Sequence, residues 1–262
     1  MNKIIKAKDG FHEIETITKD TYRINEADIV NAYLLIGKEK ALLIDCGVGI
    51  GNIKETVEEL TKLPIIVAVT HRHCDHDGGR NYFKNYYVHK GDKSLIYKIL
   101  SSKLASQTLL KESYKKDFTL SKGPYHSKAI YMDNEMVFHL GDRDISIVNV
   151  PGHTKGSVIY LDDKNKLMFT GDDVNPYLWL QLPGCSTISA WLPGAKKALD
   201  LSNTYTPYIG HSNGLITKDD ISKLISVAIK LLNKHPKFKG KNIDYPNGEE
   251  PVHIFISKNH IK

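Results

Sequence analysis

Short apolar runs separated by turn residues dominate this chain, and such runs predict strands. In the first third, three of them predict a β-meander, at residues 21–24, 29–36 and 41–45. The polar and apolar positions of residues 52–63 instead repeat with the period of a helix, with Val57 and Leu60 on one face. The apolar run 64–69, which is followed by Thr70, predicts the next buried strand.

The same alternation of apolar runs and turns returns in the second half of the chain. Further strands are predicted at residues 129–132, 136–140, 144–150, 157–161, 166–169, 205–209 and 252–256. Residues 173–186 are predicted to form a loop, and the helix that follows is expected to break at Pro193. Thr217 caps a longer amphipathic helix that extends to about Leu232.

Between the two halves, residues 78–83 predict a short helix and residues 86–89 a short strand. Residues 91–122 are rich in Leu, Lys and Ser, carry no chemical motif and are predicted to be mainly helical. We interpret them as part of a surface insertion, at about residues 91–128, in a single domain that spans residues 1–262. The order strands, helix, strands, helix occurs once in each half, which suggests two similar sheets packed face to face.

The composition is that of an ordinary globular protein, with 41% hydrophobic and 25% charged residues. No apolar run approaches the ~20 residues needed to cross a bilayer, and the first ten residues lack the apolar region of a secretory signal. We therefore expect a cytoplasmic protein with no membrane partner. Three sparse cysteines, Cys46, Cys74 and Cys185, fit a reducing compartment better than a disulfide framework.

The net charge of +6 comes from 36 Lys and Arg residues against 30 Asp and Glu residues. The excess lysines are scattered, as at residues 115–116, 196–197 and 234–241. Scattered lysines usually form a solvated face; they mildly favour an anionic small-molecule substrate and are too diffuse to indicate nucleic acid. The oligomeric state leaves no signal in the sequence.

The densest chemistry lies in the segment His71-Arg72-His73-Cys74-Asp75-His76-Asp77, directly after the predicted strand 64–69. His71 and His73 point the same way in an extended chain. Asp75 and His76 follow the turn and can face a second point nearby. Histidine-rich tracts also occur by chance on surfaces, but this density at a strand exit predicts a two-metal site. Cys74 is out of phase with the histidines and is interpreted as a packing or supporting residue.

Three further strand ends carry the same residue types beside glycines. His153 follows the strand 144–150, Asp172 follows the strand 166–169, and His211 follows the strand 205–209. The adjacent glycines leave room for close approach of the backbone. Loops at one edge of a sheet scaffold are where functional residues gather. Four strand ends therefore deliver five histidines and two aspartates to the predicted site.

Together these motifs resemble the metallo-β-lactamase-fold hydrolase superfamily, with its His-x-His-x-Asp-His motif and its downstream His, Asp and His. The order and context match from about residue 31 to residue 211. The resemblance implies an α/β (α+β) fold, an αββα four-layer sandwich of two mixed β-sheets with helices on the outer faces. The metals would lie at one edge, between the sheets.

The resemblance also implies a role for each matching residue. One metal would be held by His71, His73 and His153, a second by Asp75, His76 and His211, and Asp172 would bridge the two. Asp45 matches a family aspartate at a strand end that orients a ligand loop, although a turn or N-cap carboxylate is the alternative interpretation.

The donor set itself indicates which metals would bind. Imidazole and carboxylate ligands suit zinc, while iron or manganese stay open because no thiolate selects against them. We expect two divalent ions per chain. Two ions roughly 3.5–4 Å apart lower the pKa of a shared water from 15.7 towards ~7, which yields a nucleophile at neutral pH.

The ligand set is most similar to the hydroxyacylglutathione hydrolase (glyoxalase II) and lactonase branches. It implies a metal-dependent hydrolase that cleaves an ester, thioester or lactone bond of a small molecule. Common β-lactamases carry cysteine where this chain has Asp172, and Ser212-Asn213 replaces the aromatic glutathione contact of glyoxalase II. The alternative functions are phosphodiester or RNA hydrolysis by the same metal pair, and a catalytically inactive metal-binding protein.

Catalytic roles are expected for Asp75, Asp172 and Tyr177. The Tyr177 hydroxyl would donate a hydrogen bond to a developing oxyanion, as a tyrosine does in the lactonases that the chain resembles. Trp179 would wall an apolar pocket. Local packing is the alternative interpretation for both aromatic residues.

Overall fold

An eight-stranded sheet forms the first half of the computed structural model, which describes residues 4–93, 123–182, 184–234, 242–245 and 252–261. Its strands lie in chain order, and only the pairs from β5 to β8 are parallel. The strands are β1 (Ile4–Lys6), β2 (His12–Thr18), β3 (Thr21–Glu26), β4 (Val30–Ile36), β5 (Ala41–Ile44), β6 (Ile65–Ala68), β7 (Asn85–His89) and β8 (Lys128–Met132). The predicted meander is present, and β1 and β2 precede it.

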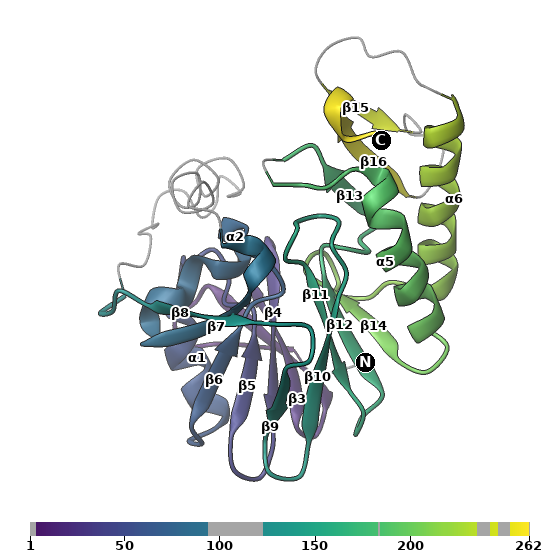
Figure 1. Cartoon of the computed structure of the whole chain (residues 1–262). Helices are drawn as coiled ribbons and strands as arrows, with labels where there is room; N and C mark the ends of the chain where they lie inside the picture. Colours follow the sequence, from purple (N-terminus) through teal and green to yellow (C-terminus); the bar gives the residue numbers. More distant parts are fainter. Residues whose placement is uncertain (1–3, 94–122, 183, 235–241, 246–251, 262) are drawn as a thin grey trace.

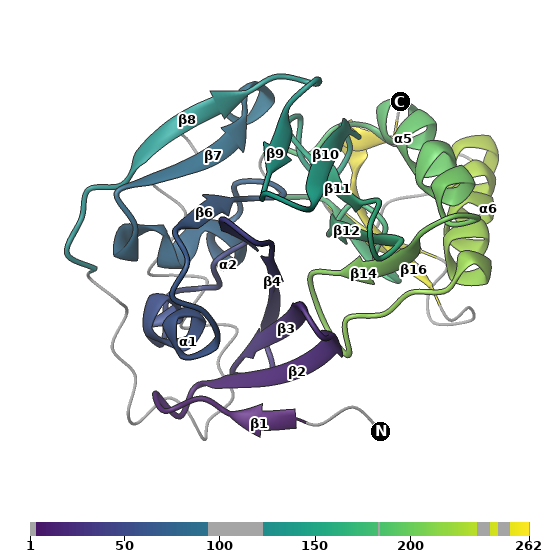
Figure 2. The same ribbon diagram turned by 90° about the horizontal axis from the view of Figure 1, so that it is seen from below.

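A second sheet of five strands forms most of the other half (Figures 1 and 2). Its spatial order is β14-β12-β11-β10-β9, with only β12 and β14 parallel. The strands are β9 (Val137–His139), β10 (Asp144–Asn149), β11 (Val158–Asp162), β12 (Leu167–Gly171) and β14 (Thr206–Ile209). The strand predictions for this region are confirmed to within a few residues at each end.

Helices cover the outer face of each sheet. Helix α1 (Ile53–Leu60) packs on the first sheet, and α5 (Ile188–Leu201) and α6 (Lys218–Lys234) pack on the second. Apolar side chains of both sheets, such as Leu35 and Phe169, meet in a buried cluster between them. The predicted four-layer αββα arrangement is therefore confirmed. None of the described helices has both the length and the apolar character of a bilayer-spanning segment.

A third, three-stranded sheet corrects the prediction of a loop at residues 173–186. It has the order β13-β16-β15, formed by β13 (Tyr177–Leu180), β15 (Asn242–Tyr245) and β16 (His253–Ser257). Exposed and buried residues alternate along β13, which is the period of a strand with one solvated face. The two prolines within residues 173–186 suggested a loop, and the parallel partner of β13, strand β16, lies far away in sequence.

The predicted break at Pro193 is also wrong, because α5 continues through it to Leu201. Proline removes one backbone donor from a helix interior and clashes with the preceding turn. Here Trp191 and Ala195, on either side of Pro193, are fully buried in the cluster beneath α5. Burial of this face against the second sheet outweighs the local cost of the proline.

At the histidine motif the chain forms helical turns, where the sequence analysis predicted a turn followed by a short helix at residues 78–83. A single α-helical turn, α2 (Cys74–Asp77), precedes a 3₁₀ segment over residues 78–82. A short 3₁₀ turn at Lys90–Asp92 follows β7. Most of the predicted helical insertion, residues 94–122, lies outside the described residues.

A buried charged cluster ties the N-terminal strands to the loop that precedes α1. His12, which is 1% exposed, lies between the carboxylates of Asp9 and Glu26. Glu26 accepts hydrogen bonds from the backbone amides of Val48 and Ile50. Burial opposes the charge on His12, but the hydrogen bonds to the two carboxylates outweigh it and raise the pKa of His12 from 6.5 to about 9.

We expect this cluster to make stability fall at alkaline pH. A folded-state pKa above the unfolded value means that the contribution of His12 is full below pH 6.5 and is lost as pH rises through about 9. The shift corresponds to about 3 kcal/mol of unfolding free energy. Urea titrations at pH 6 and pH 9.5 should show a steeper loss for the native chain than for His12→Gln. Equal losses would contradict this role.

Candidate metal centre

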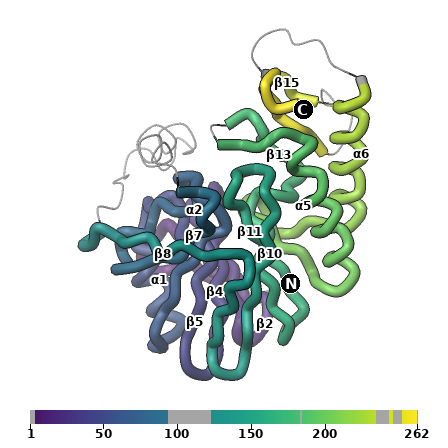
Figure 3. The backbone as a smooth tube through the Cα atoms, in the orientation of Figure 1, coloured from purple at the N-terminus to yellow at the C-terminus, as the bar shows by residue number. Residues whose placement is uncertain are grey.

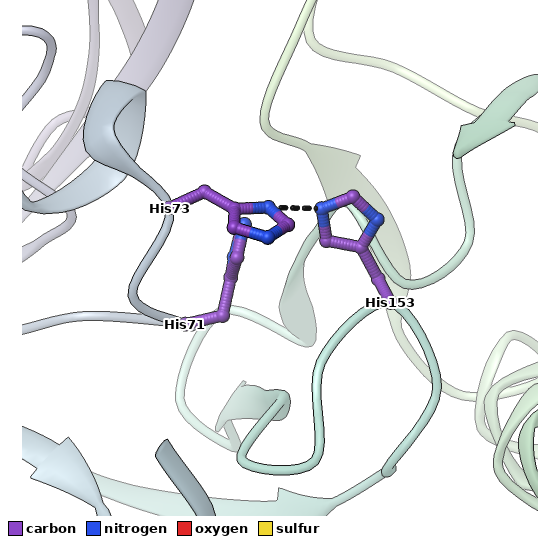
Figure 4. A group of neighbouring side chains, drawn as sticks. All are labelled: His71, His73 and His153. Atoms are coloured by element: carbon purple, nitrogen blue, oxygen red, sulfur yellow. Dashed lines mark hydrogen bonds between the residues drawn. The ribbon is translucent and has the colours of Figure 1, made fainter. Parts of the chain in front are cut away.

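Three histidines form the first of two ligand groups. His71 and His73 come from the loop after β6, and His153 comes from the loop after β10 (Figure 4). Their ring centroids lie 4.5 to 4.7 Å apart, and His73 Nδ1 lies 2.7 Å from His153 Nε2. One nitrogen of each ring lies within 4.8 Å of the others. The three imidazoles therefore converge on one point.

The second group has two aspartates and two histidines, each with one ligand atom within 4.8 Å of the rest: Asp75, His76, Asp172 and His211. His211 Nε2 lies 3.4 Å from Asp75 Oδ2 and 3.0 Å from Asp172 Oδ2. Helix α2 (Cys74–Asp77), which carries Asp75 and His76, lies at one end of the two sheets (Figures 1 and 3).

Asp172 lies where the two groups meet. Its Oδ2 atom is 3.0 Å from His211 Nε2, 3.4 Å from His76 Nε2 and 3.7 Å from His153 Nε2. One carboxylate is thus within reach of rings from both groups. The structure brings together all seven of the residues that the sequence analysis singled out as ligands.

The short helix α2 explains how one motif serves both groups. His73 has an extended backbone and is the N-cap of α2, whose amides at His76 and Asp77 donate to the His73 carbonyl. The extended residues 71–73 direct two rings to the first group. The helical turn then carries Asp75 and His76 round to the second group.

Two glycines allow the ligand loops to approach each other. Gly171 has a φ of +54°, in the left-handed region that favours glycine. At Gly210, a Cβ atom would lie 2.6 Å from Asp172 Oδ1, closer than real contacts allow. The glycine before His211 therefore makes room for the Asp172 carboxylate.

Hydrogen bonds from Nδ1 to residues outside the two groups orient four of the five rings. His153 Nδ1 donates to the carbonyl of Trp179 at 2.7 Å, and His211 Nδ1 donates to the carbonyl of Ile29 at 2.6 Å. Since a carbonyl only accepts, these rings carry the proton on Nδ1. Their Nε2 lone pairs then face the ligand groups when the rings are neutral, as metal-binding histidines require.

The two remaining oriented rings depend on Asp45 and Thr70. Asp45 Oδ2 lies 2.8 Å from His76 Nδ1, and the same carboxylate accepts from the backbone amide and the hydroxyl of Thr70. Thr70 Oγ1 in turn lies 3.0 Å from His71 Nδ1. Asp45 therefore contacts the candidate ligand His76 directly and the candidate ligand His71 through Thr70, which favours its interpretation as an orienting residue.

Asp45→Asn is expected to weaken metal binding or turnover by about 10- to 100-fold, the usual range for a residue that orients a ligand. The amide keeps the shape of the side chain but loses the charge that holds His76 Nδ1. Titration of the metal-free chain with zinc, followed by thermal unfolding, separates weaker binding from misfolding. Native metal affinity in a folded Asp45→Asn variant would contradict the role.

Unpaired polar atoms show that the two groups fit metal ions. His71 Nε2, His76 Nε2 and Asp172 Oδ1 are buried and make no hydrogen bond in the described part of the chain, although His76 Nε2 lies 3.4 Å from Asp172 Oδ2. Buried polar groups normally have partners, and a cation would satisfy all three. Imidazole nitrogens and carboxylate oxygens are the ligands that zinc, iron and manganese accept.

The electrostatics of the rings agree with this fit. Burial and the neighbouring imidazoles lower the pKa of His71 well below its usual value and that of His153 to about 3. These rings are therefore neutral and offer lone pairs. Despite burial, the carboxylates of Asp172 and Asp75 raise the pKa of His211 to about 10, and those of Asp172 and Asp45 raise that of His76. In the absence of a metal, protons on those two rings balance the acidic charge.

Asp92 is a supporting residue that the sequence analysis missed. Its buried carboxylate accepts from the backbone amides of Arg72 and Gly156 and from the hydroxyl of Thr154. The buried Arg72 guanidinium donates to the Asp92 carbonyl and lies 3.5 Å from Asp77. Asp92 thereby joins the loop of His71 and His73 to the loop of His153. Its position in a 3₁₀ turn after β7 gave no signal in sequence.

The residues outside the two groups lie as follows. Cys74 is half-buried on α2, and neither described group contains a cysteine. Tyr177 lies on the exposed face of β13, where its ring stacks on His253. The ring of Trp179 lies on the same face, and its carbonyl holds His153. The role predicted for the Tyr177 hydroxyl stays a prediction.

Comparison with known proteins decides the family. Residues 25–211 match the family model described as the metallo-beta-lactamase superfamily. This chain belongs to that superfamily. The sequence prediction of a metallo-hydrolase of this family is thereby confirmed at the level of the family, and the matched region contains all seven residues of the two groups.

The relatives that this chain matches share less than 30% of its residues in the aligned regions. Human acyl-coenzyme A thioesterase MBLAC2 is 25% identical over 191 residues, which is 65% of this chain and 67% of that protein. Glyoxylase B2 of Dictyostelium discoideum is 29% identical over 167 residues, 62% of this chain and 53% of that one. The crystal structure of DIM-1 metallo-beta-lactamase superposes with a TM-score of 0.61 at 18% identity, covering 85% of this chain and all of that one. At that identity it shows the shared fold.

Proposed function

We propose that this chain is a hydrolase that uses two divalent metal ions to cleave a thioester of a small molecule, with ester and lactone bonds as the related chemistry. The observation that carries the proposal is the pair of ligand groups that meet at Asp172. A thioester is favoured because similar proteins include an acyl-coenzyme A thioesterase and a glyoxylase.

His71, His73 and His153 would hold one ion, Asp75, His76 and His211 the other, and Asp172 would contact both. Ions bound there lower the pKa of water and polarise a carbonyl oxygen, so hydrolysis at neutral pH needs no nucleophilic side chain. Zinc is the metal we propose, because imidazole nitrogens and carboxylate oxygens are among its usual ligands.

Side chains of the protein would move the proton and keep the ligands in position. Asp75 and Asp172 are the carboxylates in the centre, and we assign to them the acceptance and release of the proton that moves from the attacking water to the leaving group. Asp75 Oδ2 lies 3.7 Å from His76 Nε2 and 3.4 Å from His211 Nε2, so both rings hold it in position. Asp45, Thr70 and Asp92 keep the ligand loops together.

The test is metal analysis combined with a substrate panel. Purified protein should contain about two ions per chain, and removal by a chelator should abolish hydrolysis, which added zinc restores. The panel holds acyl thioesters, lactones, carboxylic esters and phosphodiesters, and we expect the highest kcat/KM for a thioester. A preference for phosphodiesters would overturn the proposed substrate class. Fewer than one ion per chain would overturn the metal pair.

Tyr177→Phe tests the predicted oxyanion contact. If the hydroxyl donates to the developing oxyanion, its removal should lower kcat by about 100-fold or more with little change in KM. The phenylalanine ring keeps the stacking on His253, so folding is preserved. The same kcat in Tyr177→Phe and the native chain would exclude the contact.

A further inference from the structure

Four aromatic rings gather on one face of the three-stranded sheet. Tyr177 and Trp179 belong to β13, and His253 and Phe255 are their partners on β16. We call this set the aromatic face. Tyr177 and Trp179 are 54% and 40% exposed, the largest exposures of any described aromatic side chain on this sheet.

The rings form a continuous surface. Tyr177 stacks on His253 at a centroid distance of 5.5 Å, and His253 stacks on Phe255 at 6.2 Å. Trp179 meets Phe255 edge-on at 5.9 Å. Aromatic neighbours at these distances support one another and present one apolar surface.

The hydrophobic core does not require this surface. The alternate residues of the same strands are fully buried against α5 and α6, namely Leu178, Leu180, Ile254 and Ile256. The sheet is therefore anchored by its other face. A contiguous apolar patch that is left exposed on such a sheet marks a place where something binds.

The aromatic face adjoins the metal centre. Among the described strands β13 is at the edge of its sheet, and its outer carbonyls pair with none of these strands. One of them, the carbonyl of Trp179, accepts the 2.7 Å hydrogen bond from His153 Nδ1. The backbone beneath the Trp179 ring thus contacts a proposed metal ligand, and the surface extends from there along β13 and across to β16.

The lack of cationic side chains among the described residues of this face indicates which kind of ligand it can bind. Among the described side chains that share it, none is Lys or Arg, and the carboxylate of Asp244 is paired with His253 at 2.8 Å. Such a surface offers nothing to a phosphate or carboxylate. It suits an extended apolar chain that lies across the rings.

We propose that the aromatic face binds the apolar acyl chain of the substrate, next to the ions that act on its carbonyl. This rests on the proposed thioester hydrolysis and adds that acyl chain length determines specificity. The charged or polar leaving group then lies on the other side of the metal centre, away from β13.

The experiment measures kcat/KM for thioesters of one leaving group with acetyl, butanoyl, hexanoyl, octanoyl and decanoyl chains. In the native chain, kcat/KM should rise roughly two- to fourfold per added methylene while the chain crosses the rings, since burying one methylene gives up to about fourfold. Phe255→Ala should at least halve the slope of log kcat/KM against chain length. The loss of kcat/KM in this variant should grow with chain length and be larger for the decanoyl thioester than for the acetyl thioester, whose chain is too short to cross the rings.

Tyr131→Ala is the matched control, because Tyr131 is 44% exposed on β8 of the eight-stranded sheet. It should leave the slope unchanged. An unchanged slope in Phe255→Ala would overturn the proposal while leaving thioester hydrolysis in place. A dimer that Phe255→Ala dissociates would show that a second copy covers the face, and would overturn it as well.

A binding measurement separates this proposal from the proposed function. The chain has two tryptophans, of which Trp191 is fully buried, so Trp179 should report on the aromatic face. A non-hydrolysable decyl thioether, in which a methylene replaces the thioester carbonyl, should change the tryptophan emission of the native chain and have no such effect in Trp179→Phe. That change without hydrolysis of any thioester would support the face and contradict the function. No change would overturn the face.

Discussion

Replacing His73 with alanine is expected to lower kcat/KM at least about 1000-fold, or about 4 kcal/mol of transition-state stabilisation. His73 is one of three imidazoles in its group, with ring centroids less than 5 Å from those of His71 and His153. Without His73 its ion would keep two imidazoles and the shared Asp172 carboxylate, an incomplete set that holds a divalent ion more weakly. We therefore also expect the loss of at least one ion per chain.

Metal analysis and steady-state kinetics on the same preparation check this result. His139→Ala is the matched control, because His139 lies on β9 with a side chain that is 72% exposed. The control should keep both its metal content and its activity. Full turnover by His73→Ala would contradict the metal assignment, and so would an unchanged ion count.

Asp172→Asn should have an effect at least as large on metal content. The amide preserves the shape of the side chain and removes the negative charge that both groups approach. The pKa of Asp172 is held well below its usual value, against the effect of burial, by His211 and His76. A neutral side chain at this point no longer balances two cations, so we expect about 1000-fold lower kcat/KM and weaker binding of both ions.

The ion content separates Asp172→Asn from the other variants. His73→Ala should affect one group first, whereas Asp172→Asn should reduce both occupancies together. Asp163→Asn provides the control, since Asp163 is an exposed carboxylate in the turn between β11 and β12. If Asp172→Asn bound one ion as tightly as the native chain, the carboxylate would belong to a single group and the bridging assignment would be wrong.

The four substitutions test three different parts of the site. His73 and Asp172 test the ligands, Asp45 tests the residues that orient them, and Phe255 tests the surface beside them. The expected losses decrease in that order because the contacts become less direct. Metal content should be affected by the first three variants and not by Phe255→Ala.

Much of the centre is predictable from local sequence. The His71–Asp77 motif has its spacing set by the chain itself, with an extended start and a helical turn that send its side chains to two points. His153, Asp172 and His211 could be found because each follows a predicted strand and stands beside a glycine. Alternating apolar positions mark the strands reliably wherever one face or both faces are buried.

Other features depend on contacts between distant parts of the chain. The strand β13 pairs with β16, more than 70 residues later, and no local pattern identifies that partner. Pro193 is tolerated because Trp191 and Ala195 pack on a sheet that forms elsewhere. Local propensity is a weak guide in such places, since burial against a tertiary partner outweighs it.

The sequence alone therefore determined which residues we propose as ligands and which strands present them, because both follow from periodicity and spacing along the backbone. Only the tertiary structure decided how the rings are oriented, through Asp45, Thr70 and the carbonyls of Trp179 and Ile29. The tertiary structure alone placed Asp92 between the two ligand loops. It also placed the aromatic face next to His153. Hydrogen bonds and ring contacts of this kind join residues far apart in sequence, so their partners exist only once the sheets have packed.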